Sequence, residues 1–414
     1  MKTKSILLLI LTCFIIFSCD NNVGDYITVK VATPEFMSLD EFRTSVEIEP
    51  PSPIIESGKI YAYNDLILIK DREKGIHIID NSQPENPIKI ACIKVKANND
   101  MEIKGDYLYV DSLMDLVVFD ISDLNDIREV ARLTDVFPKY ITLPFSEDLI
   151  VDYGDYSYDP NDIIVRWNIR EERRRVEDVE YLTIGIFDDV ALAESNATTG
   201  QGGSLARFKI VNDFLYAVDS HNINIFNIND LENPEAMGGV FAGFDIETIF
   251  NRGDHLFLGS MRGMYIYDIS SPSSPQFVSE FQHGTACDPV VVDNEYAYIT
   301  LRAGNFCGAL DSSLQIVDIK DLYHPELVKS YPMDNPYGLG IKNNLIFICD
   351  GSSGLKVYNK TDIENLVMVD HFKDINTFDV IPLEERLLMI GDRELFQYKY
   401  ADNGIDLISS FSLN

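Results

Sequence analysis

The chain has 414 residues, and its 67 Asp and Glu outnumber its 34 Lys and Arg, which gives a formal net charge of −33. Such a charge repels nucleic acid phosphates and anionic membrane surfaces, so nucleic acid is not expected as a partner and cations or basic partners are the permitted classes. Beyond Phe17 no stretch approaches eighteen consecutive apolar residues, so no transmembrane helix is predicted there.

The first residues form a tripartite export pattern. Lys2 and Lys4 precede an apolar stretch from Ile6 to Phe17, and Ser18 and Cys19 follow it. This stretch is too short to cross ~30 Å of hydrocarbon, and a small residue at its end is typical of a cleavage site. Ile16-Phe17-Ser18-Cys19 resembles the lipobox of bacterial lipoproteins, in which the cysteine receives the lipid. We therefore expect a signal peptide over 1–18, a lipidated Cys19, and membrane contact through that anchor alone, with an ordinary signal peptide as the alternative.

Residues 19–57 are predicted to be a spacer and an irregular arm. The proline run from Pro50 to Pro53 disfavours regular structure, while Ser45 to Ile48 has the pattern of a strand that packs on the following domain.

From residue 58 to residue 414 the sequence repeats with a period of roughly 40 residues. Each copy contains an apolar strand, a polar turn and a second strand, and a hairpin with an aromatic-rich strand lies upstream of it. Four strands per unit cannot bury both faces alone, but units packed around an axis can, so an all-β fold with a single β-propeller is predicted. We count eight units, with seven blades plus an irregular segment as the alternative, because the unit at Asp162 is the least regular. The clearest copies begin at Gly75, Asp115, Asn222, Gly263, Ser313 and Gly354, and the weaker ones at Asp162 and Glu394.

These copies resemble the LVIVD-repeat family. The name-giving segment matches Leu314-Gln-Ile-Val-Asp318 and, more loosely, Leu116 to Asp120 and Met264 to Asp268. The opening at Gly58 and the block from Ala286 to Gly308 are also similar to lipoprotein members from Bacteroidetes. The resemblance implies a propeller and an exported setting, and it implies no activity.

The loops between strands two and three of each blade lie on the same face as the connections between blades. That face, the long-loop face, receives the connections Asp152–Asp162, Ile186–Ser204 and Leu301–Ser313, and long loops on a repeat scaffold usually gather where it binds something. The glycine-rich end of the second connection, Thr199 to Ser204, is predicted to be a flexible loop.

The inner strands begin at this face, and several acidic residues align with their starts. Clustered carboxylates raise one another's pKa and can be relieved by a cation, so a divalent ion at the channel mouth is one hypothesis, and solvated acidic strand ends are the alternative. Arg302 is expected beside Asp288 as a ligand contact. The candidate ligand-binding residues are Asp100, Asp245, Glu247, Asp288, Arg302, Tyr337 and Asp379.

Four cysteines remain after the leader and Cys19 are set aside, and they permit three full connectivities. Repeat geometry favours a disulfide between Cys287 and Cys307, with two free thiols as the alternative, whereas Cys92 and Cys349 lie in apolar strands and are expected in the core.

The sequence contains no paired zinc spacing and no nucleophile elbow. The leading hypothesis is a non-catalytic scaffold, anchored in the cell envelope on an undetermined side of the membrane, that binds a protein, peptide or glycan on its long-loop face. The alternatives are a propeller enzyme, a lyase or metal-assisted hydrolase using channel carboxylates with Arg302 or His283, and a purely structural spacer.

Overall fold

The computed structural model describes residues 26–72, 74–139, 149–154, 159, 161–175, 201–284, 289–303 and 311–414. The chain divides into two compact units, one formed by Met1–Met37 with Leu143–Ile186 and the other by Ser38–Thr142 with Phe187–Asn414.

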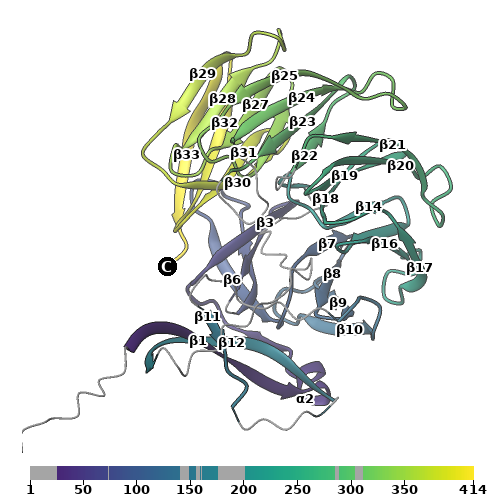
Figure 1. Ribbon diagram of the computed structural model, residues 1–414, viewed down its shortest axis with the longest axis vertical. Coiled ribbons are helices and arrows are strands. Elements are labelled where there is room, and N and C mark those ends of the chain that lie inside the picture. The colour runs from purple at the N-terminus through teal and green to yellow at the C-terminus, as the bar shows by residue number, and fades with distance from the viewer. Residues whose placement is uncertain are drawn as a thin grey trace, which may run out of the picture. The chain divides into compact units, whose positions relative to one another are not determined.

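The larger unit contains six four-stranded sheets and one six-stranded sheet in the part of the chain described. In each sheet four strands follow one another in chain order and pair antiparallel, and the sheets radiate from a common centre (Figure 1). The first strand of each sheet contacts the first strand of a neighbouring sheet, including the first and last sheets. This arrangement is a β-propeller with seven blades.

Blade 1 carries two additional strands. Its four main strands are extended at the outer edge by a strand of the N-terminal arm and at the inner edge by a strand from far along the chain. From the inner edge outward its strands are β13 (Gln201–Gly202), β3 (Ser57–Tyr63), β4 (Leu66–Asp71), β5 (Gly75–Asp80), β6 (Ile88–Lys94) and β2 (Glu47–Glu49).

The other six blades are four-stranded, and the strands of each follow chain order from the inner edge to the outer edge. Blade 2 is β7 (Met101–Lys104), β8 (Tyr107–Ser112), β9 (Asp115–Asp120) and β10 (Arg128–Leu133); blade 3 is β14 (Phe208–Val211), β15 (Phe214–Val218), β16 (Asn222–Asn227) and β17 (Glu235–Phe241); blade 4 is β18 (Ile246–Arg252), β19 (His255–Ser260), β20 (Gly263–Asp268) and β21 (Gln276–Gln282). Blade 5 is β22 (Val290–Val292), β23 (Tyr296–Leu301), β24 (Ser313–Asp318) and β25 (Glu326–Pro332); blade 6 is β26 (Leu339–Lys342), β27 (Leu345–Cys349), β28 (Leu355–Asn359) and β29 (Val367–Phe372); blade 7 is β30 (Thr377–Pro382), β31 (Arg386–Gly391), β32 (Glu394–Ala401) and β33 (Gly404–Ser412).

The propeller fold is confirmed, and the blade count corresponds to the predicted alternative of seven blades. The weak repeat at Asp162 does not form a blade in the residues described. Its strand β12 (Asp162–Arg175) belongs to the smaller unit, in a three-stranded sheet with β1 (Tyr26–Ser38) and β11 (Leu149–Val151). Buried Val29, Val31 and Ile150 form the apolar core of that sheet.

The third strand of blade 2, β9, is buried on both faces, because it lies between neighbouring strands within its blade and between neighbouring blades. In all seven blades the register shifts where the third strand pairs with the fourth, which is a β-bulge that increases twist. Gly263 is the first residue of the third strand β20, and Gly354 directly precedes the third strand β28. Their φ angles are +156° and +87°, and a Cβ at either position would meet a backbone carbonyl oxygen. Glycine is therefore required at both turns.

The ring closes between blades 1 and 7 without exchange of a strand. Blade 7 takes its outer strand from the C-terminus, as predicted, and the two blades share an apolar cluster that includes Ile60 and Leu388. The side-chain amides of Asn81 and Gln397 form two reciprocal hydrogen bonds, at 3.1 and 2.6 Å, and both side chains are buried. Buried, fully paired amides favour one arrangement of the two blades over others.

The N-terminal arm contributes to the larger unit through β2 and through helix α2 (Leu39–Arg43). Ser38 caps the helix by accepting the Glu41 N–H at 3.2 Å. The Arg43 guanidinium donates to both carboxylate oxygens of buried Asp115 at 2.9 Å, which fixes the arm to blade 2. The predicted strand near Ser45 to Ile48 corresponds to β2.

Candidate functional site: a closed channel and an exposed aromatic patch

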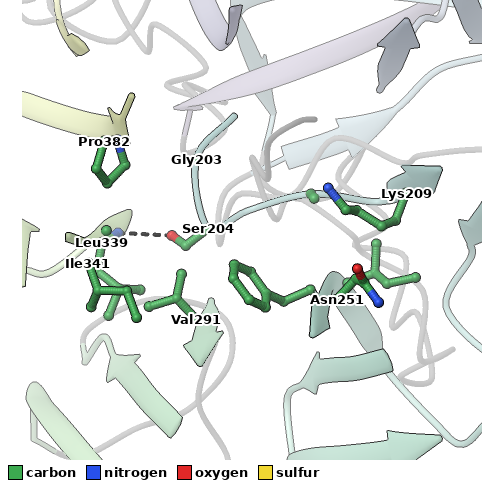
Figure 2. A pocket seen from close by; sticks show the side chains of 12 residues that line it. Gly203, Ser204, Lys209, Asn251, Val291, Leu339, Ile341 and Pro382 are labelled. Atoms are coloured by element: carbon green, nitrogen blue, oxygen red, sulfur yellow. Dashed lines mark hydrogen bonds between the residues drawn. The ribbon is translucent and has the colours of Figure 1, made fainter. Parts of the chain in front are cut away.

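The central channel is closed at its long-loop end by the chain itself. Residues 201–206, which we call the channel segment, begin as β13 on the inner edge of β3, with Gly202 opposite Tyr61. Ser204, Leu205 and Ala206 are buried, and the Ser204 Oγ accepts the Leu339 N–H at 2.8 Å from across the channel (Figure 2). The prediction of a flexible loop at Thr199 to Ser204 is therefore wrong for the residues described from Gln201 onward, because glycines here permit close approach to the channel wall.

Asp100 lies just before β7, beneath this segment rather than at an open mouth. Its Oδ2 forms an ion pair with the Lys59 Nζ at 2.8 Å, and both side chains are at most 2 % exposed. The same carboxylate accepts the backbone N–H groups of Met101, Arg207 and Phe208. These four partners occupy the acceptor positions of the carboxylate, so Asp100 holds the end of the channel segment in place.

Asp379, on β30, is fully buried against the channel segment. A Cβ at Gly203 would lie 1.8 Å from its Oδ1, which shows how closely the two chains approach. Burial raises the pKa of Asp379 to about 8, although the Val380 N–H bond and the charge of Lys59 oppose the shift. The carboxyl is therefore largely protonated at neutral pH and cannot serve as a charged ligand for a cation.

We expect Asp379→Asn to stabilise the protein at alkaline pH. The pKa of Asp379 is about 8 in the folded state and ~3.9 in an unfolded chain, so the folded state binds the extra proton and stability falls as pH rises from about 4 to about 8. Asn keeps an acceptor for the Val380 N–H and does not ionise. Urea unfolding should give Asp379→Asn a free energy of unfolding about 1–3 kcal/mol above that of the wild type at pH 8, and this difference should shrink toward pH 4. Asp402 is exposed, so Asp402→Asn is the control. An equal gain in stability from this control would contradict a raised pKa at Asp379.

Two more of the predicted acidic residues lie on blade 4. Glu247 is buried on β18, and Asp245, in the turn before it, pairs with the Arg262 guanidinium at 2.9 Å. The predicted residues therefore do not form an open ring of carboxylates in the residues described. Their role in binding a ligand stays a prediction, as does that of Asp288, which lies outside those residues.

Arg302 and Tyr337 come together on the long-loop face between blades 5 and 6. The Arg302 guanidinium stacks over the Tyr337 ring at 4.0 Å from its centroid, and Tyr337 packs edge-on against Phe378. The Thr300 hydroxyl donates to the Tyr337 carbonyl at 2.8 Å, which fixes the turn. Arg302 thus has a stacking partner that the sequence did not indicate.

An exposed aromatic patch lies on the same face, between blades 3 and 4. Phe241 and Phe244 are 57 % and 50 % exposed, and their rings meet edge to face at 5.4 Å. The His221 ring contacts Phe244 at 5.6 Å, and the Arg262 guanidinium lies over Phe244 at 5.6 Å. We call these four residues the aromatic patch. Sequence reasoning missed it, although two phenylalanines in the connection GVFAGFD were a usable signal.

Much of the acidity on this face is structural. Asp71, Asp111 and Asp350 end the second strands of their blades and accept backbone N–H groups from the loop that leads into the same blade. Each carboxylate therefore orders a connection between blades.

Within the residues described, no group of three or more His, Cys, Asp or Glu side chains is arranged to hold a metal ion. The same part of the chain has no helix with the length and apolar character needed to span a membrane.

Cys92 and Cys349 are free and buried, as predicted for core cysteines. Burial raises the pKa of the Cys92 thiol to about 11, so it is a poor nucleophile at neutral pH. Cys19, the predicted lipidation site, and Cys287 and Cys307, the predicted disulfide pair, lie outside the described residues, so both stay predictions.

A protein-family model for the LVIVD repeat matches residues 97–135, 249–282 and 283–332. The chain is a β-propeller protein with LVIVD repeats. No curated protein matches the sequence.

Solved structures share the fold at low sequence identity. A protein from Lactobacillus plantarum is 9 % identical with a TM-score of 0.54, over 86 % of this chain and 94 % of that one. Sqt1 from Saccharomyces cerevisiae is 7 % identical with a TM-score of 0.51, over 86 % of each chain, and BamB from Moraxella catarrhalis is 8 % identical with a TM-score of 0.50, over 90 % of this chain and 98 % of its own. These similarities define the fold alone.

The closing Asp of the LVIVD segment has a structural role in this chain. Asp318 of the matching segment accepts the N–H of Lys320, two residues on, at 2.9 Å, and Asp120 and Asp268 accept the equivalent N–H groups of Ser122 and Ser270. The side chains of Ser122, Ser270 and Lys320 hold the pKa of these carboxyls below the usual value, and the backbone N–H groups of the Asx turns add to this effect. Each turn ends the third strand. The repeat aspartates are thus committed to turns on the face opposite the long loops.

Proposed function

We propose that this protein is a non-catalytic, envelope-anchored scaffold that binds a partner protein through the aromatic patch on its long-loop face. The single observation that carries the proposal is the exposure of Phe241 and Phe244, whose rings pack edge to face and are bordered by His221 and Arg262. Exposed aromatic rings next to an arginine are typical of the residues that dominate protein–protein binding energy. In a chain with a net charge of −33, a partner with basic and apolar side chains is the complementary class.

The anchor part of the proposal rests on the leader, in which Ile16-Phe17-Ser18-Cys19 resembles the lipobox of bacterial lipoproteins. Lipidation at Cys19 would place the propeller at a membrane without any spanning segment. In detergent phase separation the wild-type protein should enter the detergent phase, and Cys19→Ser should remain in the aqueous phase.

The alternative of an enzyme using channel carboxylates has less support. Asp100 is saturated by Lys59 and three backbone N–H groups, and Asp379 is protonated and buried under the channel segment. Neither residue can reach a substrate from solvent. A peptide or a glycan on the aromatic patch remains the alternative ligand.

We expect Phe241→Ala with Phe244→Ala to remove most partner binding without affecting the fold. Both side chains are half exposed, so truncation changes stability little, whereas loss of a central aromatic contact costs about 2 kcal/mol or more of binding, which is more than tenfold in affinity. The measurement is the amount of each protein that co-purifies with the lipidated chain from native envelopes.

Phe277→Ala is the matched control, because Phe277 is equally exposed, at 56 %, on the outer strand β21. Partners that depend on the patch should survive this control and disappear with the double variant. Retention of every partner by the double variant would refute the proposal, and recovery of a bound peptide or glycan instead would reassign the class of ligand.

A further inference from the structure

The propeller channel contains a cavity of about 180 Å³ next to the channel segment. Its wall is made by the inner strands of blades 3 to 7 together with Gly203, Ser204 and Ala206. The side chains that line it are mostly apolar, as Ile249, Val291, Leu339 and Pro382 illustrate, while nearly half of the lining surface belongs to polar atoms. A cavity of roughly 150 Å³ admits benzene, so this volume fits a molecule of about six to ten non-hydrogen atoms.

Among the described residues that line this cavity, Lys209 is the only charged one. Its side chain extends from β14 into the space beside the channel segment (Figure 2). Within the part of the chain that the structure describes, its ammonium makes no hydrogen bond and no ion pair. Burial lowers the pKa of Lys209, and the charge of Glu102 on the neighbouring strand β7 opposes the shift. Glu102 itself uses Oε1 to accept the Ile210 N–H at 2.8 Å.

Two neutral polar groups complete the lining. The Ser204 Oγ accepts the Leu339 N–H, so its hydroxyl proton can be donated to a ligand. The Asn251 Nδ2 donates to the carbonyls of Gly253 and His255, which leaves the amide oxygen as an acceptor. The polar groups are therefore few, as in small-molecule sites, and Figure 2 shows Lys209 and Asn251 on one side of the cavity and Ser204 on the other, next to Leu339.

We propose that this cavity binds a small organic anion, with its carboxylate on Lys209 and a compact apolar body against Ile249, Val291 and Leu339. An ammonium in an apolar cavity is costly unless it has a partner. Water could supply hydrogen bonds but would leave the apolar walls without contacts, whereas a carboxylate with an apolar body satisfies both. The inference is independent of partner binding on the aromatic patch.

The test uses benzoate as the probe and benzamide as its uncharged counterpart, with the purified mature chain. Titration calorimetry and thermal unfolding should show benzoate binding and a raised Tm, with benzamide at least tenfold weaker. Lys209→Met should weaken benzoate binding by at least tenfold. Lys329→Met removes the charge of an exposed lysine on β25 and should bind benzoate as the wild type does.

Ile341→Phe provides a second variant that keeps the charge and fills the cavity, and it should abolish benzoate binding. It decides the question if Lys209→Met does not fold. Equal benzoate binding by Lys209→Met or by Ile341→Phe would overturn the proposal. So would equal binding of benzamide, or the absence of heat and of any Tm shift with benzoate up to about 10 mM.

Discussion

Lys59→Met should strongly destabilise the propeller, with a loss of about 3–5 kcal/mol in the free energy of unfolding. Lys59 and Asp100 are 2 % and 1 % exposed and form a 2.8 Å ion pair. Removing the lysine leaves the Asp100 carboxylate buried, with only backbone N–H groups as its partners. It also removes a positive charge that lowers the pKa of Asp379. Urea unfolding at pH 7 measures the change.

The companion variant Lys59→Met with Asp100→Asn removes both charges and should recover much of the loss, since a neutral amide is far less costly to bury. Lys94→Met is the control, because Lys94 pairs with Glu47 at the surface, where an ion pair contributes less than about 1 kcal/mol. A loss below about 1 kcal/mol for Lys59→Met would show that the buried pair does not hold the channel together.

Gly203→Ala should lower the free energy of unfolding by about 1–3 kcal/mol, as overpacking of a well-packed interior does. Its Cβ would lie 1.8 and 2.1 Å from the two carboxyl oxygens of Asp379, so either Asp379 or the channel segment must move. Because Ser204 bonds Leu339, movement of the segment should also expose backbone groups inside the channel. Hydrogen exchange at Leu339 reports that exposure.

A double-mutant cycle isolates this contact. Gly203→Ala combined with Asp379→Ala should cost less than the sum of the two single changes, because the alanine side chain at 379 makes room for the new methyl group. Gly58→Ala is the matched control, since its Cβ would make only an ordinary contact with Lys70 at 3.6 Å. Strict additivity would mean that Gly203 and Asp379 do not touch.

The blades could be predicted because each is built from local pairs. The hairpin turns, the glycine at the start of the third strand and the closing Asp all lie within one repeat, so short-range sequence patterns report them. The Asx turn at Asp268 shows why this residue recurs: its carboxylate is bound within two residues along the chain.

The channel segment could not be predicted, because its partners lie far away in the sequence. Gln201 and Gly202 pair with Ala62 and Tyr61, and Ser204 bonds Leu339. A glycine-rich stretch has no periodicity that indicates burial. The same limit explains Asp162–Arg175: its place in the repeat spacing predicted a blade, whereas the strand that it pairs with is β1, far away in the N-terminal part of the chain.

Alignment of the repeats placed Asp100 and Asp379 at the starts of inner strands, where the structure has them, but their burial was not foreseen. Asp100 and Asp379 lie at inner-strand starts, and the channel segment covers them. Alignment of repeats gives the position of a residue within its blade, and it contains no information about an inserted chain that passes over it.

Site-specific photocrosslinking tests the proposed binding surface most directly. A photoreactive amino acid replaces Phe241 on the aromatic patch, or Tyr323, which is 70 % exposed in the turn between β24 and β25 on the opposite face, and native cells are irradiated. We predict a discrete crosslinked protein from position 241 that is absent from position 323 and is lost when Phe244→Ala is added. Partner binding on this face would be contradicted if both positions gave the same crosslinks, or if position 241 gave no crosslink.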